Sequence, residues 1–217
     1  MRFKAVVFDL DGTLVDTIGD IAVAMNRMLG KHGWTALDRS SYRSLVAEGM
    51  RSLVSRSIPV EMREPAAIEE CMREFEEEYS CTAGDSAVVY PGIDALLEGV
   101  LARGLKTAVH TNTPDAIARK VVLRLLGKWP FDYVVGVGEG LPDKPDPAGA
   151  LAISRMMCIH PSHVLYLGDS GVDMRTSLAA GMFPVGALWG FRSREELVAA
   201  GAARVVSEPT QVLPILG

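Results

Sequence analysis

The chain of 217 residues carries 22 basic and 27 acidic side chains, which gives a formal net charge of −5 and a sequence pI near 5.4. This balance argues against nucleic acid as the main partner, since a duplex-binding protein presents a basic face. No apolar run reaches the ~18 residues of a membrane span, and the N-terminus does not resemble a secretory signal, so we expect a soluble, cytoplasmic protein without a membrane partner.

The first predicted element is a strand over residues 3–10, FKAVVFDL. Asp9 lies near its end, and Asp11 and Gly12 follow directly. Two carboxylates that leave a strand together repel each other. They are tolerated where a divalent cation neutralises them or where one of them holds a proton.

The stretch that follows, residues 15–85, contains no clear strand. Its apolar spacing and punctuation predict three or four helices, at 17–31, about 40–47, about 50–58 and 63–79. Thr17 and Asp20 have the spacing of a capping box at the start of the first helix. We therefore predict a helical cap subdomain over residues 15–85, inserted into a core formed by residues 1–14 and 86–217.

Beyond this insertion, short apolar runs alternate with helical stretches. Four more strands are predicted, at 105–111, 133–137, 164–167 and 184–188. Helices are predicted between them and after the last, at 93–103, 114–127, 147–158, 171–181 and from 194. Short runs that are apolar on both faces fit a parallel sheet covered by helices on both sides. The predicted core is therefore a doubly wound, Rossmann-like α/β fold.

Two of these helices carry sequence signals for their first residues. Thr113 and Pro114 predict an N-cap followed by proline at the first helical position. Ser193 and Glu196 have the spacing of a capping box. Both signals place a helix directly after a strand or its loop, as a doubly wound fold requires.

Polar side chains gather at the predicted strand ends, where doubly wound sheets bind their ligands. They stand after three strands and in one loop on the same edge: Asp9, Asp11, Thr111, Asn112, Lys144, Asp169 and Asp173. Taken singly, most of them are explained as turn formers, caps or surface residues. Their joint occurrence at one edge favours a functional site.

The residue types at this edge suit a metal ion and a phosphate group. Carboxylates such as those of Asp9, Asp11 and Asp169 are hard ligands for Mg²⁺, which typically takes a substrate phosphate as well. Gly12 lets the backbone turn tightly toward a bound anion. Lys144 would place a positive charge where the negative charge of a phosphoryl group must be balanced.

On these residues the chain resembles the haloacid dehalogenase-like hydrolase superfamily. The run DLDGTLVD at 9–16 resembles motif I of that superfamily, and Thr111 after a strand resembles motif II. Lys144 resembles motif III, and Asp169 with Asp173 resembles motif IV. The helical insertion falls where the superfamily places its α-helical cap.

The resemblance implies a role for each motif residue. Asp9 would be the nucleophile that forms an aspartyl-phosphate, and Asp11 would be the general acid and base. Thr111 and Lys144 would hold the phosphoryl oxygens, while Gly12 and Asn112 are predicted to bind substrate.

The resemblance also implies Mg²⁺ as the cofactor. The side chains of Asp9 and Asp169 and the main-chain carbonyl of Asp11 would bind it. Asp173 would orient Lys144 and the waters of the metal.

The substrate class follows in part from motif I. The carbon–halogen and carbon–phosphorus hydrolases of the superfamily lack an aspartate at the position of Asp11, so the resemblance favours phosphate esters. The stretches 45–54 and 189–213 are similar to phosphoglycolate phosphatases, although Thr113 stands where many of those carry lysine. We therefore expect hydrolysis of a small phosphorylated metabolite, with phosphoglycolate as the best candidate, by a monomer or homodimer.

Other readings remain open on the sequence. A phosphosugar mutase would share the nucleophile but return the phosphoryl group to a sugar hydroxyl. Another phosphatase of the superfamily would act on a sugar phosphate, a nucleotide or pyrophosphate. A catalytically silent binding module would need a broken set of motif residues, whereas this set is complete.

The cap offers candidates for a second charge on the substrate. Phosphoglycolate carries a carboxylate that the core motifs leave unpaired. Gly49 marks a break between two predicted cap helices, and the amides that open the next helix form a natural anion site. Arg51 lies two residues on and is predicted to bind the substrate, with Arg43 and Arg56 as further candidates.

Overall fold

The computed structural model describes residues 3–46, 49–138 and 140–217. The chain divides into two compact units. The core unit comprises Met1–Asp16 and Val89–Gly217, and the helical unit comprises Thr17–Val88. Two short strands, β2 (Val15–Asp16) and β3 (Val88–Val89), pair with each other where the chain passes between the units.

The core unit is built on a six-stranded sheet in the order β5-β4-β1-β6-β7-β8, with every neighbouring pair parallel. Its strands are β1 (Ala5–Phe8), β4 (Lys106–Pro114), β5 (Tyr133–Val137), β6 (Val164–Gly168), β7 (Phe183–Ala187) and β8 (Arg204–Val206). The doubly wound α/β fold predicted from the sequence is confirmed. The sixth strand, β8, was not predicted, because three residues at a sheet edge are too short for a periodic signal.

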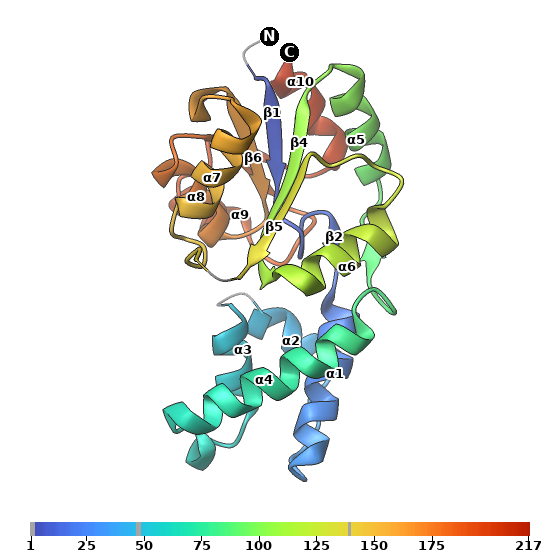
Figure 1. Ribbon diagram of the computed structural model, residues 1–217, viewed down its shortest axis with the longest axis vertical. Coiled ribbons are helices and arrows are strands. Elements are labelled where there is room, and N and C mark those ends of the chain that lie inside the picture. The colour runs from blue at the N-terminus through green and yellow to red at the C-terminus, as the bar shows by residue number, and fades with distance from the viewer. Residues whose placement is uncertain (1–2, 47–48, 139) are drawn as a thin grey trace. The chain divides into compact units, whose positions relative to one another are not determined.

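Helices cover both faces of this sheet, and Figure 1 shows α7 and α8 on one side with α5 and α10 on the other. The helices of the core unit are α5 (Ile93–Ala102), α6 (Asp115–Leu126), α7 (Ala148–Met157), α8 (Gly171–Ala179), α9 (Arg194–Ala199) and α10 (Leu213–Leu216). Ala5 and Val7 of β1 share a buried cluster with Ala150 and Ile153 of α7. Because side chains alternate along a strand, the intervening Val6 and Phe8 face the opposite side, which is why β1 is apolar throughout.

The starts of two helices differ in how well the sequence predicted them. Ser193 does cap α9, since its side chain accepts a hydrogen bond from the Glu196 amide. Thr113 does not cap α6: it belongs to β4, Pro114 holds the N-cap position, and no side chain caps that helix. The predicted N-cap at Thr113 is therefore wrong, because the strand continues to the proline.

The helical unit contains α1 (Ile18–Lys31), α2 (Arg39–Leu45), α3 (Met50–Ser57) and α4 (Pro65–Thr82). Ala47, the predicted end of the second helix, lies outside the described residues. The predicted capping box is wrong, since the Thr17 side chain makes no cap bond. Asp20 is instead buried, and its two carboxylate oxygens accept hydrogen bonds from the amides of Gly84 and Ser86, both at 2.6 Å. Two charge-assisted bonds satisfy a buried carboxylate better than one helix amide does.

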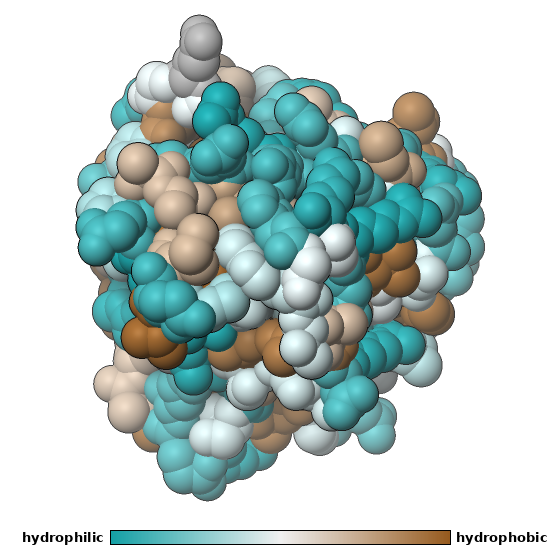
Figure 2. Space-filling view, turned by 90° about the horizontal axis from the view of Figure 1, so that it is seen from below, coloured by the Kyte–Doolittle hydropathy of each residue, from teal (hydrophilic) through white to brown (hydrophobic). Residues whose placement is uncertain are grey.

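Several large apolar side chains are exposed, among them Val60, Val88 and Leu123. Figure 2 shows one face on which hydrophilic residues dominate and hydrophobic ones are scattered between them. Among the described residues, no helix combines the length and the apolar character that a membrane crossing would require.

Candidate active site

The carboxyl ends of three adjacent strands bring the motif residues together. In the register of the sheet, Phe8 of β1 lies beside Val109 of β4 and Leu167 of β6. The residues that follow these positions therefore emerge at one edge, as expected for parallel strands. Asp9 continues the ladder, since its amide donates to the Leu167 carbonyl at 2.8 Å.

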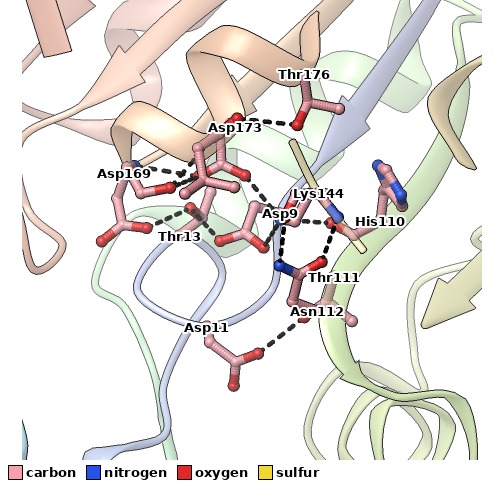
Figure 3. Close-up of polar contacts among 12 residues, drawn as sticks. Asp9, Asp11, Thr13, His110, Thr111, Asn112, Lys144, Asp169, Asp173 and Thr176 are labelled. Atoms are coloured by element: carbon pink, nitrogen blue, oxygen red, sulfur yellow. Dashed lines mark hydrogen bonds and ion pairs between the residues drawn. The ribbon is translucent and has the colours of Figure 1, made fainter. Parts of the chain in front are cut away.

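Lys144 lies at the centre of the site, where it is buried with Asp9 and Asp173 (Figure 3). Its Nζ is 2.7 Å from Asp9 Oδ1, 2.7 Å from Asp173 Oδ1 and 3.2 Å from the His110 carbonyl oxygen. Three acceptors match the three protons of an ammonium group. Burial alone would lower the pKa of Lys144, but the charges of Asp173 and Asp9 raise it well above its ordinary value, so this side chain is a fixed cation.

The loop that carries Lys144 is fastened to β4 by Asn112. The Asn112 side chain donates to the Lys144 carbonyl at 3.0 Å and accepts from the Lys144 amide at 2.8 Å. Both ends of this amide group are thus committed to the lysine backbone. The Asn112 side chain therefore positions Lys144, and its predicted contact with a substrate stays a prediction.

Two further buried polar side chains, those of His110 and Tyr166, lie close to Lys144. The His110 ring nitrogen Nδ1 and the Tyr166 hydroxyl are 3.0 Å apart, and both side chains are buried. Burial, together with the nearby charge of Lys144, lowers the pKa of His110 to about 3, so its ring is neutral. The His110–Tyr166 pair therefore places polar groups near Lys144 without adding a charge.

Three buried carboxylates, from Asp9, Asp169 and Asp173, offer oxygen atoms that all lie within 4.8 Å of one another. Burial and the charge of Asp173 raise the pKa of Asp9 well above its ordinary value. Burial and the same charge raise the pKa of Asp169 to about 7. A single lysine cannot balance three carboxylates, and a divalent cation that prefers oxygen ligands, such as Mg²⁺, fits this donor set.

The loop after Asp9 is shaped to close over Asp169. Gly12 has a φ of +85°, and a Cβ atom there would overlap Asp169 Oδ2. The Asp169 Oδ2 atom accepts a hydrogen bond from the Phe191 amide at 2.6 Å, which fixes the carboxylate. Thr13 lies between the two acids, its hydroxyl 3.1 Å from Asp9 Oδ2 and 3.4 Å from Asp169 Oδ1. A side chain at position 12 would overlap Asp169 and Phe191, so the loop or one of these residues would have to move.

Asp11 is held apart from the three clustered carboxylates (Figure 3). Its Oδ2 atom accepts hydrogen bonds from the Thr111 hydroxyl at 2.9 Å and the Thr113 hydroxyl at 2.7 Å. Thr113 was predicted to cap a helix, and its contact with Asp11 was not predicted. The alternation of β4 was the available signal, because residues two apart on a strand face the same side.

Arg51 belongs to α3 of the helical unit and is not one of the residues that the strand ends bring together. It is exposed and forms an ion pair with Glu69 of α4. Its predicted contact with a substrate stays a prediction.

The raised pKa values of Asp9 and Asp169 predict how a divalent cation and pH act together on stability. An aspartate whose pKa is raised in the folded state favours the protonated form there. The metal-free folded state therefore loses stability as pH rises from about 4, the unfolded value, through about 7, the folded value of Asp169. Mg²⁺ replaces protons on these carboxylates and offsets the loss.

We expect Mg²⁺, at a concentration about 100 times its Kd at pH 8, to raise the melting temperature by about 5–10 °C near pH 8, and the same concentration to raise it by much less near pH 5.5. Thermal unfolding with EDTA or Mg²⁺ at the two pH values measures this difference. An equal Mg²⁺ effect at both pH values would show that the cation does not bind to these acids.

Comparison with known proteins identifies similar chains. A family model described as haloacid dehalogenase-like hydrolase matches residues 6–187. A phosphoglycolate phosphatase of Rhodospirillum rubrum is 33% identical, over 94% of this chain and 87% of that protein. One from Pseudomonas putida is 30% identical, over 97% of this chain and 79% of that protein. A crystal structure of a Lactobacillus delbrueckii subsp. bulgaricus protein has a TM-score of 0.90 at 24% identity, covering 100% and 99% of the two chains.

Proposed function

The chain belongs to the haloacid dehalogenase-like hydrolase family and is a phosphatase, and we propose that it hydrolyses a small phosphomonoester through a phosphorylated Asp9, with Mg²⁺ as cofactor. One observation carries the proposal: the Asp9 carboxylate lies 2.7 Å from the Lys144 ammonium and clusters with the buried carboxylates of Asp169 and Asp173. Once a cation binds beside it, an aspartate in that position is ionised, held in one orientation and shielded from water. Those are the conditions under which a carboxylate acts as a nucleophile.

The cation would be held by Asp9, Asp169 and the main-chain carbonyl of Asp11, with Asp173 close by. When bound, it supplies positive charge to the phosphoryl oxygens and neutralises the acids. Lys144 contributes the second positive charge of the site, and Thr111 adds a hydroxyl donor. Together these groups stabilise the charge that develops on the transferring phosphoryl group.

The first chemical step transfers the phosphoryl group to Asp9. An Asp9 carboxylate oxygen bonds to phosphorus, the ester P–O bond breaks, and the leaving oxygen takes a proton from Asp11. Water then attacks the same phosphorus atom and gives a proton to Asp11. The P–O bond to Asp9 breaks, inorganic phosphate leaves, and both aspartates return to their starting states.

Phosphoglycolate is the substrate we propose first. The two curated relatives described above are named phosphoglycolate phosphatases, and each is at least 30% identical over nearly the whole chain. A phosphate screen tests the proposal. Phosphoglycolate, sugar phosphates, nucleotides and pyrophosphate are each incubated with the protein, with Mg²⁺ or with EDTA, and free phosphate is measured.

We expect phosphate release that needs Mg²⁺ and is highest with phosphoglycolate. Ca²⁺ should inhibit, because its looser coordination misplaces Asp9 relative to phosphorus. Transfer of the phosphoryl group to a second sugar hydroxyl without phosphate release would identify a mutase instead. Full activity after exhaustive chelation would overturn the role of the cation.

Arg51 is the residue we propose for the substrate carboxylate. Replacing Arg51 by alanine should raise KM for phosphoglycolate by about tenfold, the value of one lost charged contact, and leave a neutral aryl phosphate unaffected. Arg73→Ala, at another exposed arginine of the helical unit, serves as the control. Equal losses on both substrates would mean that Arg51 supports the fold through its ion pair with Glu69. No loss on either would exclude Arg51 from substrate binding.

A further inference from the structure

Two threonine hydroxyls converge on one oxygen atom of Asp11. Thr111 and Thr113 are both buried, at 2% and 1% exposure, and stand two residues apart on β4. Their hydroxyl oxygens lie 2.9 and 2.7 Å from Asp11 Oδ2. The Thr113 amide also donates to the Thr111 hydroxyl oxygen at 3.0 Å, so the two residues form one connected unit. The two buried hydroxyl groups thereby fix the partly exposed carboxylate of Asp11.

We propose that Thr113 is the positioning residue that orients the Asp11 carboxyl group for proton transfer to the leaving group. This inference rests on the proposed function, in which Asp11 is the general acid. It extends that function to a residue which matches none of the four motifs. Thr113 acts through Asp11 and needs no contact with the substrate.

Thr113, rather than Thr111, is the positioning residue because each hydroxyl group has only one proton for a hydrogen bond. A hydroxyl group donates one hydrogen bond. In the proposed mechanism the Thr111 hydroxyl donates its hydrogen bond to a phosphoryl oxygen when substrate binds, so its hydrogen bond to Asp11 is lost at that moment. Thr113 then provides the hydroxyl that continues to hold Asp11 during the reaction.

The geometry also identifies the oxygen of Asp11 that the threonines hold. Both hydroxyl groups donate to Oδ2. A hydroxyl at position 113 therefore sets the direction in which the Asp11 carboxyl group points.

Leaving-group dependence tests the proposal, because a good leaving group departs without a proton. We compare Thr113→Val, which keeps the shape and removes the hydroxyl, with Thr113→Ser, which keeps the hydroxyl. The value of kcat/KM is measured on an alkyl phosphate and on dinitrophenyl phosphate, since it reports the step in which the leaving group departs. General acid catalysis contributes about 10²–10⁴-fold, and a misplaced acid loses part of it.

The valine variant should lose about tenfold or more on the alkyl phosphate and less than about threefold on dinitrophenyl phosphate. The serine variant should recover the alkyl rate. Thr113→Ala provides a second variant without the hydroxyl in case the valine side chain disturbs the strand. Equal loss on both substrates, or no loss on either, would overturn the proposal.

A separate variant distinguishes failure of this inference from failure of the proposed function. Asp11→Asn should show the same split between the two substrates, and more strongly, if Asp11 is the general acid. If Asp11→Asn shows the split and the Thr113 variants do not, the acid role stands and the positioning role falls. If Asp11→Asn lowers both rates equally, the acid role itself is wrong.

Discussion

Replacing Asp9 by asparagine should lower phosphate release by at least about 1,000-fold while the protein stays folded. Asparagine has nearly the same shape as aspartate, and its amide oxygen can still accept the hydrogen bond from Lys144. It is not a nucleophile, so the covalent step is lost. Since burial and neighbouring charges raise the pKa of Asp9, removing its charge should not lower the melting temperature of the metal-free protein at about pH 8.

Circular dichroism, thermal unfolding and phosphate release should be measured on the same preparation. Mass spectrometry of the peptide that contains position 9 excludes deamidation back to aspartate. Asp38→Asn, at an exposed aspartate before α2, is the matched control and should keep full activity. Residual activity above a few per cent in a preparation free of deamidation would remove Asp9 from the nucleophile role.

Replacing Lys144 by methionine should have the second large effect, on stability as well as on activity. The variant leaves Asp9 and Asp173 buried without the ammonium group that lies 2.7 Å from each. Breaking a buried ion pair from one side costs about 3–5 kcal/mol, which corresponds to a melting temperature lower by about 6–20 °C. Phosphate release should fall by at least about 100-fold, because one of the two positive charges at the phosphoryl group is gone.

The partner acid provides the control for this variant. Adding Asp173→Asn to Lys144→Met removes one of the two uncompensated charges, so the double variant should recover part of the lost stability in EDTA. Activity should not recover, since the phosphoryl group still lacks the lysine. A double variant no more stable than the single one would mean that shape, rather than charge, explains the loss.

Much of the core could be predicted because its strands and helices are marked by signals within short stretches of sequence. The five longer strands of the sheet are short apolar runs, and each observed strand begins within three residues of its predicted position. The site residues Asp9, Thr111 and Asp169 stand where those runs end. A parallel sheet brings such ends to one edge whatever the intervening chain does. Lys144 was placed at the same edge because its loop follows the third predicted strand.

The parts that could not be predicted depend on contacts between distant residues. The roles of Thr113 and Asp20 were misassigned, because capping signals are local and the true partners are far along the chain. The short β8 strand exists only because it pairs with β7. The bond from the Asn112 side chain to the Lys144 backbone was not predicted either, since a contact with a residue 32 positions away leaves no trace in the sequence.

The central claim is that Asp9 becomes phosphorylated during turnover. Rapid quenching of the working protein followed by borohydride reduction tests it, because an aspartyl-phosphate is reduced to homoserine whereas a free carboxylate is not. We predict homoserine at position 9 when substrate and Mg²⁺ are present, and none without substrate or in Asp9→Asn. Phosphate release with no homoserine at any aspartate, or with homoserine at another position, would contradict the claim.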